Sequence, residues 1–326
     1  MSNLLIVSPE PQALQLTDST FIPTLFTKAG EQASYRFVEF FTATIPNANT
    51  RKAYFRAVQR LSDWCELHGL ELTHLNPVFM AKYIQELGET VSAPTVKQHL
   101  AAIRMLFDYL VTGHVLHVNP ATAVKGPKYV IHKGKTPVLT ALETRDLLDS
   151  IPIDTIGGLR DRALIGVMTF SFARVGAVAG MDVGDYFQKG RRHWLRLHEK
   201  GGKYHEMPAH HNIEEYVGDY LDEAGIAHEK KKPLFRTLNR KRQLSENRIN
   251  RFDVFQMIRR RARQAKLSEN ICCHTFRGTG ITVYLQNGGS LEVAQQMAAH
   301  SSPETTKLYD RTSDEISLDE VERIII

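Results

Sequence analysis

The stretch of sequence that decides the fold is His274-Thr-Phe-Arg277-Gly-Thr-Gly, followed by Met297-Ala-Ala-His300-Ser-Ser-Pro-Glu-Thr-Thr-Lys-Leu-Tyr309. It places two histidines, an arginine and a tyrosine in a fixed order near the end of the chain. A guanidinium group binds anionic phosphate oxygens, and a phenol with a pKa near 10 becomes nucleophilic beside cations and a base. The order therefore favours attack on a phosphodiester over a structural role.

Length and composition restrict the class of protein. The 326 residues suffice for two domains, and 42% hydrophobic with 24% charged residues is ordinary for a globular chain. No apolar run approaches the roughly 20 residues that cross a bilayer, and the first residues lack the pattern of a secretory signal. Three cysteines fit a reducing compartment, so we expect a cytoplasmic protein. Cys272-Cys273 beside His274 has no second ligand pair at zinc-finger spacing, which disfavours a metal site.

Positive charge is concentrated in one segment. Residues 228–266 contain fourteen Lys or Arg and three acids, a net charge of +11, whereas the whole chain carries +5 and the remainder is therefore −6. Such a concentrated field favours contact with DNA. A solvated helix face is the alternative that the count alone leaves open.

Five regions follow one another along the chain. Residues 1–33 have no clear periodicity and predict an extended or partly disordered arm, and residues 34–120 carry the apolar periodicity of an all-helical domain. Residues 121–138 are rich in Lys, Gly and Pro and predict a linker. Residues 139–313 form the second domain, and residues 314–326 form an amphipathic C-terminal tail. In the first domain, one helix is predicted from Ser34 to near Pro46, and a second begins at Asn49 or Thr50. A third is predicted from Pro77 to Gly88, and a fourth from near Ser92 to Val111.

The second domain is predicted to be mostly helical with one small sheet. Thr140-Ala-Leu-Glu143 has the pattern of a capping box, which starts a helix. Residues 194–208 alternate and turn on Gly201-Gly202, as in a β-hairpin. The fold class is therefore mainly α with a small antiparallel sheet.

The final motif resembles the tyrosine recombinases, the phage-integrase family that includes Xer-like and Cre-like site-specific recombinases. Asn49-Thr-Arg-Lys-Ala-Tyr54 and Thr95-Val-Lys-Gln-His-Leu-Ala-Ala-Ile-Arg104 resemble that family's core-binding domain. The resemblance covers residues 34–313. It implies a SAM-like helical core-binding domain and a catalytic domain with the DNA breaking-rejoining fold.

The resemblance also assigns roles in catalysis. Arg174 and Arg277 would bind the scissile phosphate, and His300 would hydrogen-bond to it. Tyr309, on a helix predicted to open at Ser302-Pro303, would be the nucleophile, and His274 its base. Lys200 resembles the hairpin lysine that protonates the leaving oxygen, with Lys203 as a nearby rival.

Two departures from the family pattern lie near Arg174. Three positions after its first arginine the family usually carries an acid that orients the basic groups, and this chain has Ala177. The orientation must then come from elsewhere, with Asp182 and Asp185 as candidates, or the site is less tightly preorganised. Ser171-Phe172 replaces the family's usual Thr-Gly.

The implied function is site-specific DNA recombination in integration, excision or resolution, through a 3′-phosphotyrosine and a Holliday junction. Neither a metal nor another cofactor is expected. The implied partners are double-stranded DNA and three further copies in a tetrameric synapse, without a membrane, in a bacterial nucleoid-associated setting. The alternatives are a type IB topoisomerase-like relaxing enzyme and a catalytically dead DNA-binding regulator. The tail would dock on a neighbouring protomer or on its own domain.

Eight basic residues are candidates for DNA contact outside the catalytic set. They are Arg51, Lys52, Lys97, Arg104, Lys241, Arg242, Arg248 and Arg251.

Overall fold

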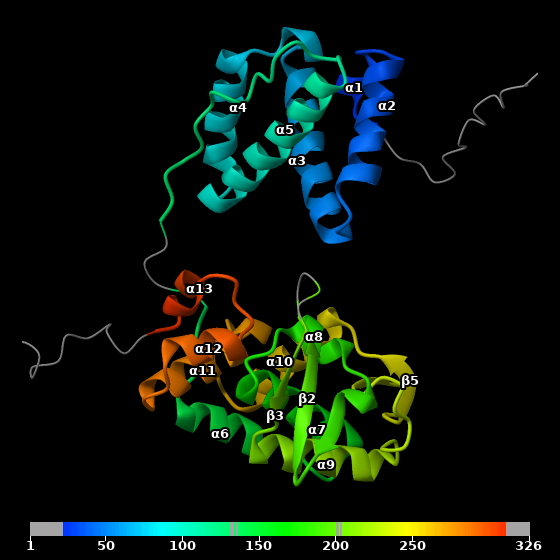
Figure 1. Cartoon of the computed structure of the whole chain (residues 1–326), viewed down its shortest axis with the longest axis vertical. Helices are drawn as coiled ribbons and strands as arrows, with labels where there is room; N and C mark the ends of the chain where they lie inside the picture. The colour runs from blue at the N-terminus through cyan, green and yellow to red at the C-terminus, as the bar shows by residue number, and fades with distance from the viewer. Residues whose placement is uncertain (1–21, 131–133, 135, 200–201, 203, 311–326) are drawn as a thin grey trace, which may run out of the picture. The chain divides into compact units, whose positions relative to one another are not determined.

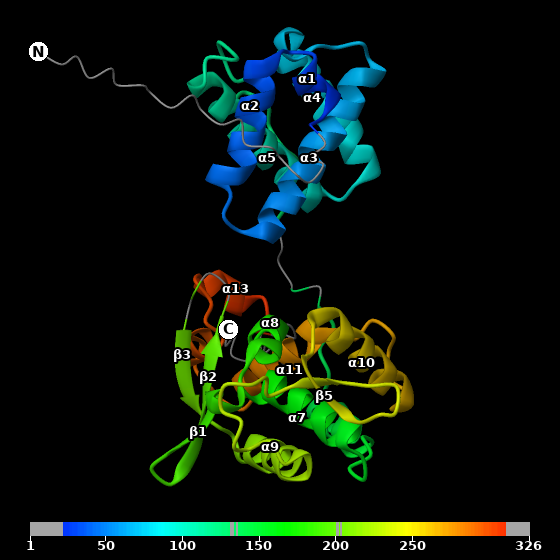
Figure 2. The ribbon, with the colours of Figure 1, turned by 90° about the vertical axis from the view of Figure 1, so that its right-hand side faces the viewer.

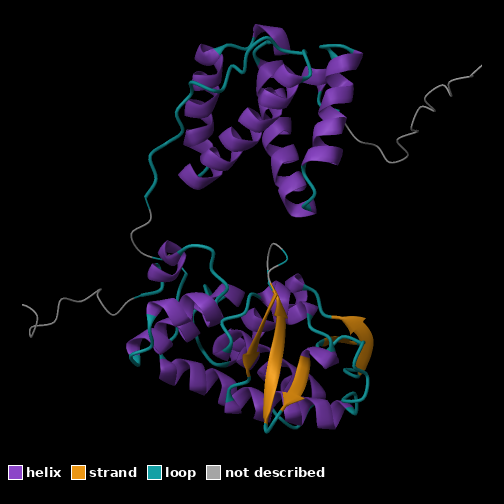
Figure 3. Cartoon of the chain, in the orientation of Figure 1, coloured by secondary structure: helices purple, strands orange, loops and turns teal. Residues whose placement is uncertain are grey.

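The computed structural model describes residues 22–130, 134, 136–199, 202 and 204–310. The chain divides into two compact units, residues 1–130 and 131–326 (Figure 1). Helices dominate both units and the strands belong to the second (Figure 3), which confirms the mainly α class. Among the described helices, none is long and apolar enough to cross a membrane.

The first unit is an all-helical bundle with its own apolar core. Aromatic rings fill much of that core, with Phe26 and Phe37 centroids 4.6 Å apart and Phe37 and Phe41 centroids 4.9 Å apart. The unit consists of α1 (Thr24–Thr27), α2 (Glu31–Glu39), the π-helical turn η1 (Phe40–Thr44), α3 (Ala48–Leu67), the 3₁₀ turn η2 (Leu72–His74), α4 (Pro77–Thr90) and α5 (Ala93–Thr112).

The ordered bundle begins earlier than the sequence predicts. The arm was expected to extend to residue 33, but α1 and the start of α2 lie before that point, and residues 1–21 are outside the described residues. Leu25, Phe26 and Ala33 are buried in the bundle core. Long-range packing of these few apolar side chains orders a segment too short to show a helical period of its own.

Helix starts follow local capping chemistry. The cap of α3 is Asn47 and not Asn49 or Thr50, because the Asn47 side chain accepts hydrogen bonds from the N–H groups of both later residues. Pro77 is the first residue of α4 as predicted, but that helix continues past Gly88 to Thr90. Interior packing overrides the weak helix preference of a single glycine.

The first part of the predicted linker belongs to the bundle. The Arg104 guanidinium on α5 donates hydrogen bonds to the carbonyls of Ala121 and Val124, and both acceptor residues are buried. The remainder of the linker includes residues 131–133 and 135, which are outside the described residues.

The second unit packs a three-stranded sheet along one side of a helical body (Figures 1 and 2). Its central helix α7 carries eleven buried residues and contacts α9, α11, α8 and α6. The elements are α6 (Ala141–Asp149), α7 (Ile156–Phe170), α8 (Val175–Gly180), the 3₁₀ turn η3 (Val183–Asp185), β1 (Tyr186–Lys189), β2 (Arg192–His198), β3 (Tyr204–Pro208), α9 (His211–Ala224), β4 (Arg236–Leu238), β5 (Leu244–Arg248), α10 (Arg251–Gln264), α11 (Cys273–Gln286), α12 (Leu291–Met297) and α13 (Pro303–Lys307).

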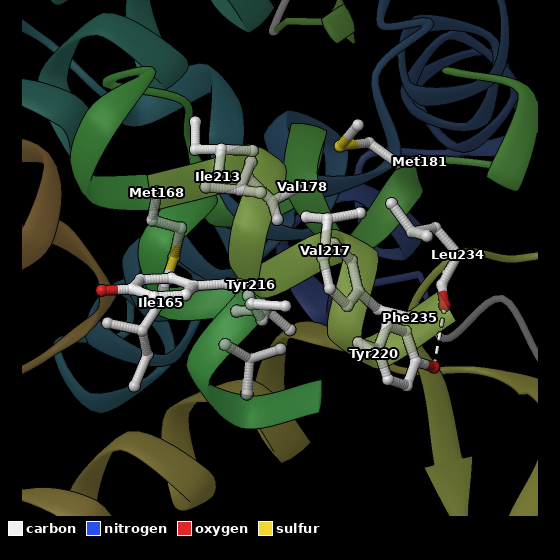
Figure 4. Packing of buried hydrophobic residues seen from close by; sticks show 14 of the residues in the cluster. Ile165, Met168, Val178, Met181, Ile213, Tyr216, Val217, Tyr220, Leu234 and Phe235 are labelled. Atoms are coloured by element: carbon white, nitrogen blue, oxygen red, sulfur yellow. Dashed lines mark hydrogen bonds between the residues drawn. The ribbon is translucent and has the colours of Figure 1, made fainter. Parts of the chain in front are cut away.

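The core of this unit lies around α7 and α9 (Figure 4). Ile165 and Val217 are fully buried there, and Tyr220 places its hydroxyl 2.9 Å from the carbonyl of Leu234, to which it donates. That hydrogen bond satisfies the polar atom of the buried Tyr220 side chain and offsets the cost of its desolvation.

The predicted capping box and hairpin are both present. Thr140 and Glu143 cap α6 reciprocally, and β2 pairs antiparallel with β3. The expectation of one sheet is wrong, because β4 and β5 form a second, two-stranded sheet. Their sequence is basic and polar with little apolar alternation, so the strands gave no clear signal.

Candidate active site

Arg277 is the buried centre of the site. Its side chain, on α11, is 1% exposed, and its two terminal nitrogens donate to the backbone carbonyls of Phe172 and Ala298. These acceptors lie two residues before Arg174 and two residues before His300. One guanidinium thus fixes the backbone of two distant segments that each carry a predicted site residue.

The backbone beside both acceptors has left-handed geometry. Phe172 has φ of +56° and Ala299 has φ of +47°. Residues with a side chain rarely adopt this region, and each such position costs of order 1–3 kcal/mol. The Phe172 ring is buried against Ile281 and Leu285, which offsets the strain. The left-handed backbone at position 172 gives a physical reason for the glycine that the family usually carries there.

Glu199 binds Arg174 through both carboxylate oxygens. Oε1 accepts the backbone N–H of Arg174 at 3.0 Å, and Oε2 accepts Nη1 of the same residue at 2.5 Å. Oε1 also lies 3.9 Å from Nη1 of Arg277. The two predicted phosphate-binding arginines therefore share one buried carboxylate, which sequence reasoning missed.

The two aspartates expected to replace the absent acid at Ala177 have other partners. Asp182 accepts a hydrogen bond from Arg248 at 2.5 Å, and Asp185 lies 3.8 Å from Arg196. Among the described contacts, neither carboxylate pairs with Arg174 or Arg277. The expectation is therefore wrong, because the acid comes from the hairpin and not from the segment that follows α8.

The alternation of β2 could have predicted this. Leu195 and Leu197 are fully buried, and Glu199 is the next residue in the same two-residue period, so it points to the same face. His205 on β3 pairs with Leu197 and shares that inner face.

His205 is a second residue that sequence reasoning missed. Both of its ring nitrogens are buried, and the described residues give neither of them a hydrogen bond of regular geometry. Burial lowers the pKa of His205, and the charge of Arg277 lowers it further, whereas Glu199 and the Met297 backbone raise it. His205 therefore belongs to the electrostatic environment of the arginine pair.

His274 lies within the field of the same charges. Its pKa is lowered from 6.5, first by partial burial among site atoms and then by the positive charges of Arg277 and Arg174, with Glu199 opposing. His274 is nevertheless exposed to solvent, so this burial is incomplete. A neutral imidazole at pH 7 can accept a proton, as the predicted base must.

Tyr309 lies directly against the residue that follows Arg277. A Cβ on Gly278 would be 3.2 Å from the Tyr309 ring, so glycine leaves room for the phenol. The ring stacks on His300 with centroids 6.0 Å apart and an interplanar angle of 9°. His300 Nδ1 lies 2.9 Å from Thr306 Oγ1 on α13, which orients the imidazole.

The helix that carries the tyrosine segment is shorter than predicted. α13 opens at Pro303 with Ser302 as its cap but ends at Lys307, so Tyr309 lies just beyond it. The Tyr309 carbonyl accepts a hydrogen bond from Thr282 on α11, which holds the segment to the site helix.

The structure thus brings together five of the six predicted catalytic residues in the second unit. The sixth, Lys200, lies outside the described residues, as does its rival Lys203. Burial and the neighbouring cation Arg174 lower the pKa of Arg277 to about 10, so Arg277 remains charged at neutral pH. Glu199 and Tyr309 oppose that shift. Paired guanidinium groups, a neutral histidine and a phenol suit phosphoryl transfer to tyrosine.

The basic segment divides into structural and exposed cations. Six of its fourteen basic side chains form ion pairs within the unit: Lys232, Arg236, Arg248, Arg259, Arg260 and Arg261. The other eight are exposed and have no ion pair in the described part of the chain: Lys230, Lys231, Arg240, Lys241, Arg242, Arg251, Arg263 and Lys266. This second group is exposed and is not committed to an ion pair within the described residues, so it is available to meet DNA.

The same distinction applies to the candidate DNA contacts. Arg51 and Arg104 donate to backbone carbonyls of the bundle, and Arg248 is bound to Asp182. The candidates with exposed side chains and no such bond in the described residues are Lys52, Lys97, Lys241, Arg242 and Arg251.

Fold and site together define a mainly α, two-unit protein with an arginine pair, two histidines and a tyrosine for phosphoryl transfer. Residues 137–315, more than half of the chain, match the Phage integrase family, and residues 42–114 match the Phage integrase N-terminal SAM-like domain. The chain belongs to the phage integrase family and is a tyrosine-type site-specific recombinase.

Curated relatives agree with this assignment. The chain is 28% identical over 273 residues to tyrosine recombinase XerD of Corynebacterium glutamicum, which covers 81% of this chain and 87% of XerD. It is 31% identical over 233 residues to tyrosine recombinase XerC of Chlamydia pneumoniae, which covers 71% of this chain and 72% of XerC. A relaxing enzyme or an inactive regulator is not favoured.

Solved structures share the fold. The XerH site-specific recombinase in a post-cleavage complex with palindromic difH substrate has a TM-score of 0.67 at 18% identity, covering 84% of this chain and 79% of XerH. A lambda integrase (75–356) dimer bound to a COC′ core site has a TM-score of 0.63 at 15% identity, covering 87% and 95%.

Proposed function

We propose that this recombinase breaks and rejoins DNA through Tyr309. The Tyr309 oxygen attacks the scissile phosphorus and forms the 3′-phosphotyrosine bond, while the bond from phosphorus to the 5′-oxygen breaks. His274 takes the phenol proton and Lys200 supplies a proton to the leaving oxygen. A 5′-hydroxyl of the partner duplex then attacks the phosphotyrosine, and two such exchanges pass through a Holliday junction.

The arginine pair and His300 would stabilise the transition state. Negative charge increases on the nonbridging oxygens as the pentavalent phosphorus forms, and guanidinium groups meet it with charge-assisted hydrogen bonds. The observation that carries the proposal is that Arg174 and Arg277 share the buried Glu199 carboxylate. Tyr309 lies against Gly278, the residue that follows Arg277. Arg277 Nε is buried without a hydrogen-bond partner in the described residues and supports the role of phosphate donor.

DNA would be the substrate and a tetramer the active assembly. XerH and lambda integrase, which share the fold, are described in complex with difH substrate and with a core site, and a lambda integrase tetramer is described on a Holliday junction. In this chain, residues 34–120 would clamp the duplex and residues 139–313 would carry the chemistry. The exposed cations of residues 228–266 would bind its phosphates, with the complex acting in the cytoplasm at the bacterial nucleoid.

A covalent-adduct assay tests this proposal. The bound sequence is first selected from a random duplex library and then built into a nicked suicide substrate. Wild type is expected to form a protein–DNA adduct that resists denaturation, and Tyr309→Phe is expected to form none while binding DNA within about twofold of wild type. Tyr204→Phe is the matched control, because Tyr204 is an exposed phenol on the outer face of the hairpin.

The control should retain the adduct. An adduct with Tyr309→Phe, or none with wild type, contradicts the proposal. Plasmids with two selected sites separate exchange from simple relaxation, since a relaxing enzyme removes supercoils without exchanging the sites.

Arg174→Ala tests the phosphate-binding role separately. Removing one preorganised donor from a developing oxyanion lowers rates by about 10²–10³, and we expect a loss of that size in single-turnover cleavage. Arg162→Ala is the control, because Arg162 pairs with Glu215 and stacks on Tyr216 of α9, and neither contact involves a predicted catalytic residue. Equal rates for Arg174→Ala and wild type would remove Arg174 from the site.

A further inference from the structure

The Glu199 carboxylate lies where the two site arginines approach each other. Its side chain is 1% exposed, and it accepts both the backbone N–H and the Nη1 hydrogen of Arg174. A second contact of 3.9 Å reaches Nη1 of Arg277. A buried carboxylate is costly unless it is paired and hydrogen-bonded, and these contacts meet that requirement.

This geometry fixes Arg174 in two places at once. One carboxylate oxygen holds the backbone at the start of α8, and the other holds the guanidinium of the same residue. The long arginine side chain is thereby limited to a small set of rotamers. Arg174 nevertheless retains 28% exposure, so donors remain available on the side away from Glu199.

We propose that Glu199 is a positioning residue that orients Arg174 and Arg277 toward the scissile phosphate, in place of the acid that Ala177 lacks. This inference rests on the proposed function of the arginines. Ala177 is a buried residue one helical turn after Arg174, and its short side chain offers no acceptor. Glu199 reaches the same guanidinium from the hairpin, immediately before Lys200 in the chain.

The carboxylate also offsets repulsion between the two cations. Arg174 lowers the pKa of Arg277, and Glu199 raises it. Without the Glu199 charge, the two guanidinium groups would have no acidic partner among the described residues until DNA binds.

A competing role as a phosphate mimic is less consistent with the contacts. A carboxylate that must leave before DNA binds would lie on the exposed side of Arg174. Glu199 instead lies on the inner face of the sheet, in register with Leu195 and Leu197.

The test compares two substrates with wild type, Glu199→Gln and Glu206→Gln. Single-turnover cleavage is measured on the selected site with a normal scissile phosphate and with a methylphosphonate at that position. The methyl group removes one charged nonbridging oxygen, so a misaligned arginine matters less on that substrate. Glu206 is the matched control, because it faces the opposite side of the same hairpin and pairs with Arg196 and Tyr204.

We expect Glu199→Gln to lower the rate about 10- to 100-fold on the phosphate, as small misplacements of catalytic groups do, and to lose much less on the methylphosphonate. DNA affinity is expected to stay within about twofold, and Glu206→Gln should match wild type on both substrates. An equal loss on both substrates overturns the positioning role in favour of a structural one. A Glu199→Gln rate on the phosphate equal to that of wild type also overturns the positioning role. A rate above that of wild type overturns it too, and indicates that Glu199 acts as a phosphate mimic.

Glu199→Asp serves if the glutamine variant does not fold. The aspartate keeps the charge but shortens the side chain by one methylene. Its loss of cleavage rate relative to wild type must therefore also be smaller on the methylphosphonate than on the phosphate. An equal loss on both substrates overturns the proposal. Wild type and Tyr309→Phe are run beside these variants. Absence of a wild-type adduct refutes the proposed function, whereas a wild-type adduct with an unimpaired Glu199→Gln refutes only the role of Glu199.

Discussion

Phe172 combines a strained backbone with a buried ring, and the magnitudes decide which effect dominates. Its left-handed φ of +56° costs of order 1–3 kcal/mol, whereas truncating a buried phenylalanine to alanine costs about 3–5 kcal/mol. The ring contributes more than the strain costs. This explains how a large residue occupies a position whose backbone suits glycine.

The stabilities of Phe172 variants should therefore follow an unusual order, with the glycine variant more stable than the alanine variant. We expect Phe172→Ala to lower the free energy of unfolding by about 3–5 kcal/mol. Phe172→Gly should be less harmful by about 1 kcal/mol, because glycine relieves the left-handed strain. Urea unfolding followed through Trp194, the tryptophan of the second unit, measures both. A glycine variant less stable than the alanine variant would show that the strain is negligible.

The lowered pKa of His274 predicts the pH dependence of cleavage. Its pKa lies below 6.5, so the imidazole is neutral at pH 7 and ready to accept the Tyr309 proton. Single-turnover cleavage should be level above neutral pH and should fall as acid protonates His274. His274→Gln should be slow and should lose this acidic limb. A wild-type rate that already falls between pH 8 and pH 7 contradicts His274 as the base.

Between elements, one buried carboxylate joins α7 to α10. Asp161 is fully buried and accepts hydrogen bonds from Arg160, Arg260 and Arg261, at 2.7 to 3.0 Å for the shortest contact of each. Part of the basic segment is therefore a structural network, and the net charge of +11 overstates what DNA can meet.

Asp161→Asn should be strongly destabilising. Breaking a buried ion pair by removing one partner costs about 3–5 kcal/mol, because the remaining charges stay buried and unpaired. Glu215→Gln on α9 is the control, because the Glu215 carboxylate is exposed and its ion pair with Arg162 of α7 is worth at most about 1 kcal/mol. Thermal unfolding of both variants gives the comparison. A loss below about 1 kcal/mol for Asp161→Asn would mean that the arginines find other acceptors.

At the scale of the whole molecule, the C-terminal tail bears on assembly. The C-terminal tail, residues 314–326, is amphipathic in sequence and lies outside the described residues. We expect that its deletion leaves suicide-substrate cleavage within about threefold of wild type but reduces synapsis and strand exchange by at least about tenfold, because one docked apolar segment contributes a few kcal/mol. Native gels with paired sites and a two-site exchange assay measure these losses. Unchanged exchange would mean that the tail packs in cis or has no role in assembly.

The sequence by itself indicated the class of protein, the main helices of the first unit and the candidate catalytic residues, because these predictions depend on local signals. Capping residues, the apolar period of α5, the glycine hairpin and the spacing from His274 to Tyr309 are all readable along the chain. The family motif carries the resemblance in the same linear form.

Only the tertiary structure decided how the site is held. Glu199 reaches Arg174 across 25 residues, and Arg277 reaches the Phe172 carbonyl across 105 residues. Such partners are set by packing of the hairpin and α11 against α7 and α8. The alternation of β2 indicates that Glu199 faces inward, but it does not indicate which side chains Glu199 meets there. The missing acid at Ala177 therefore looked like a defect in the sequence, but the fold supplies a carboxylate from a different element because a buried arginine pair requires one.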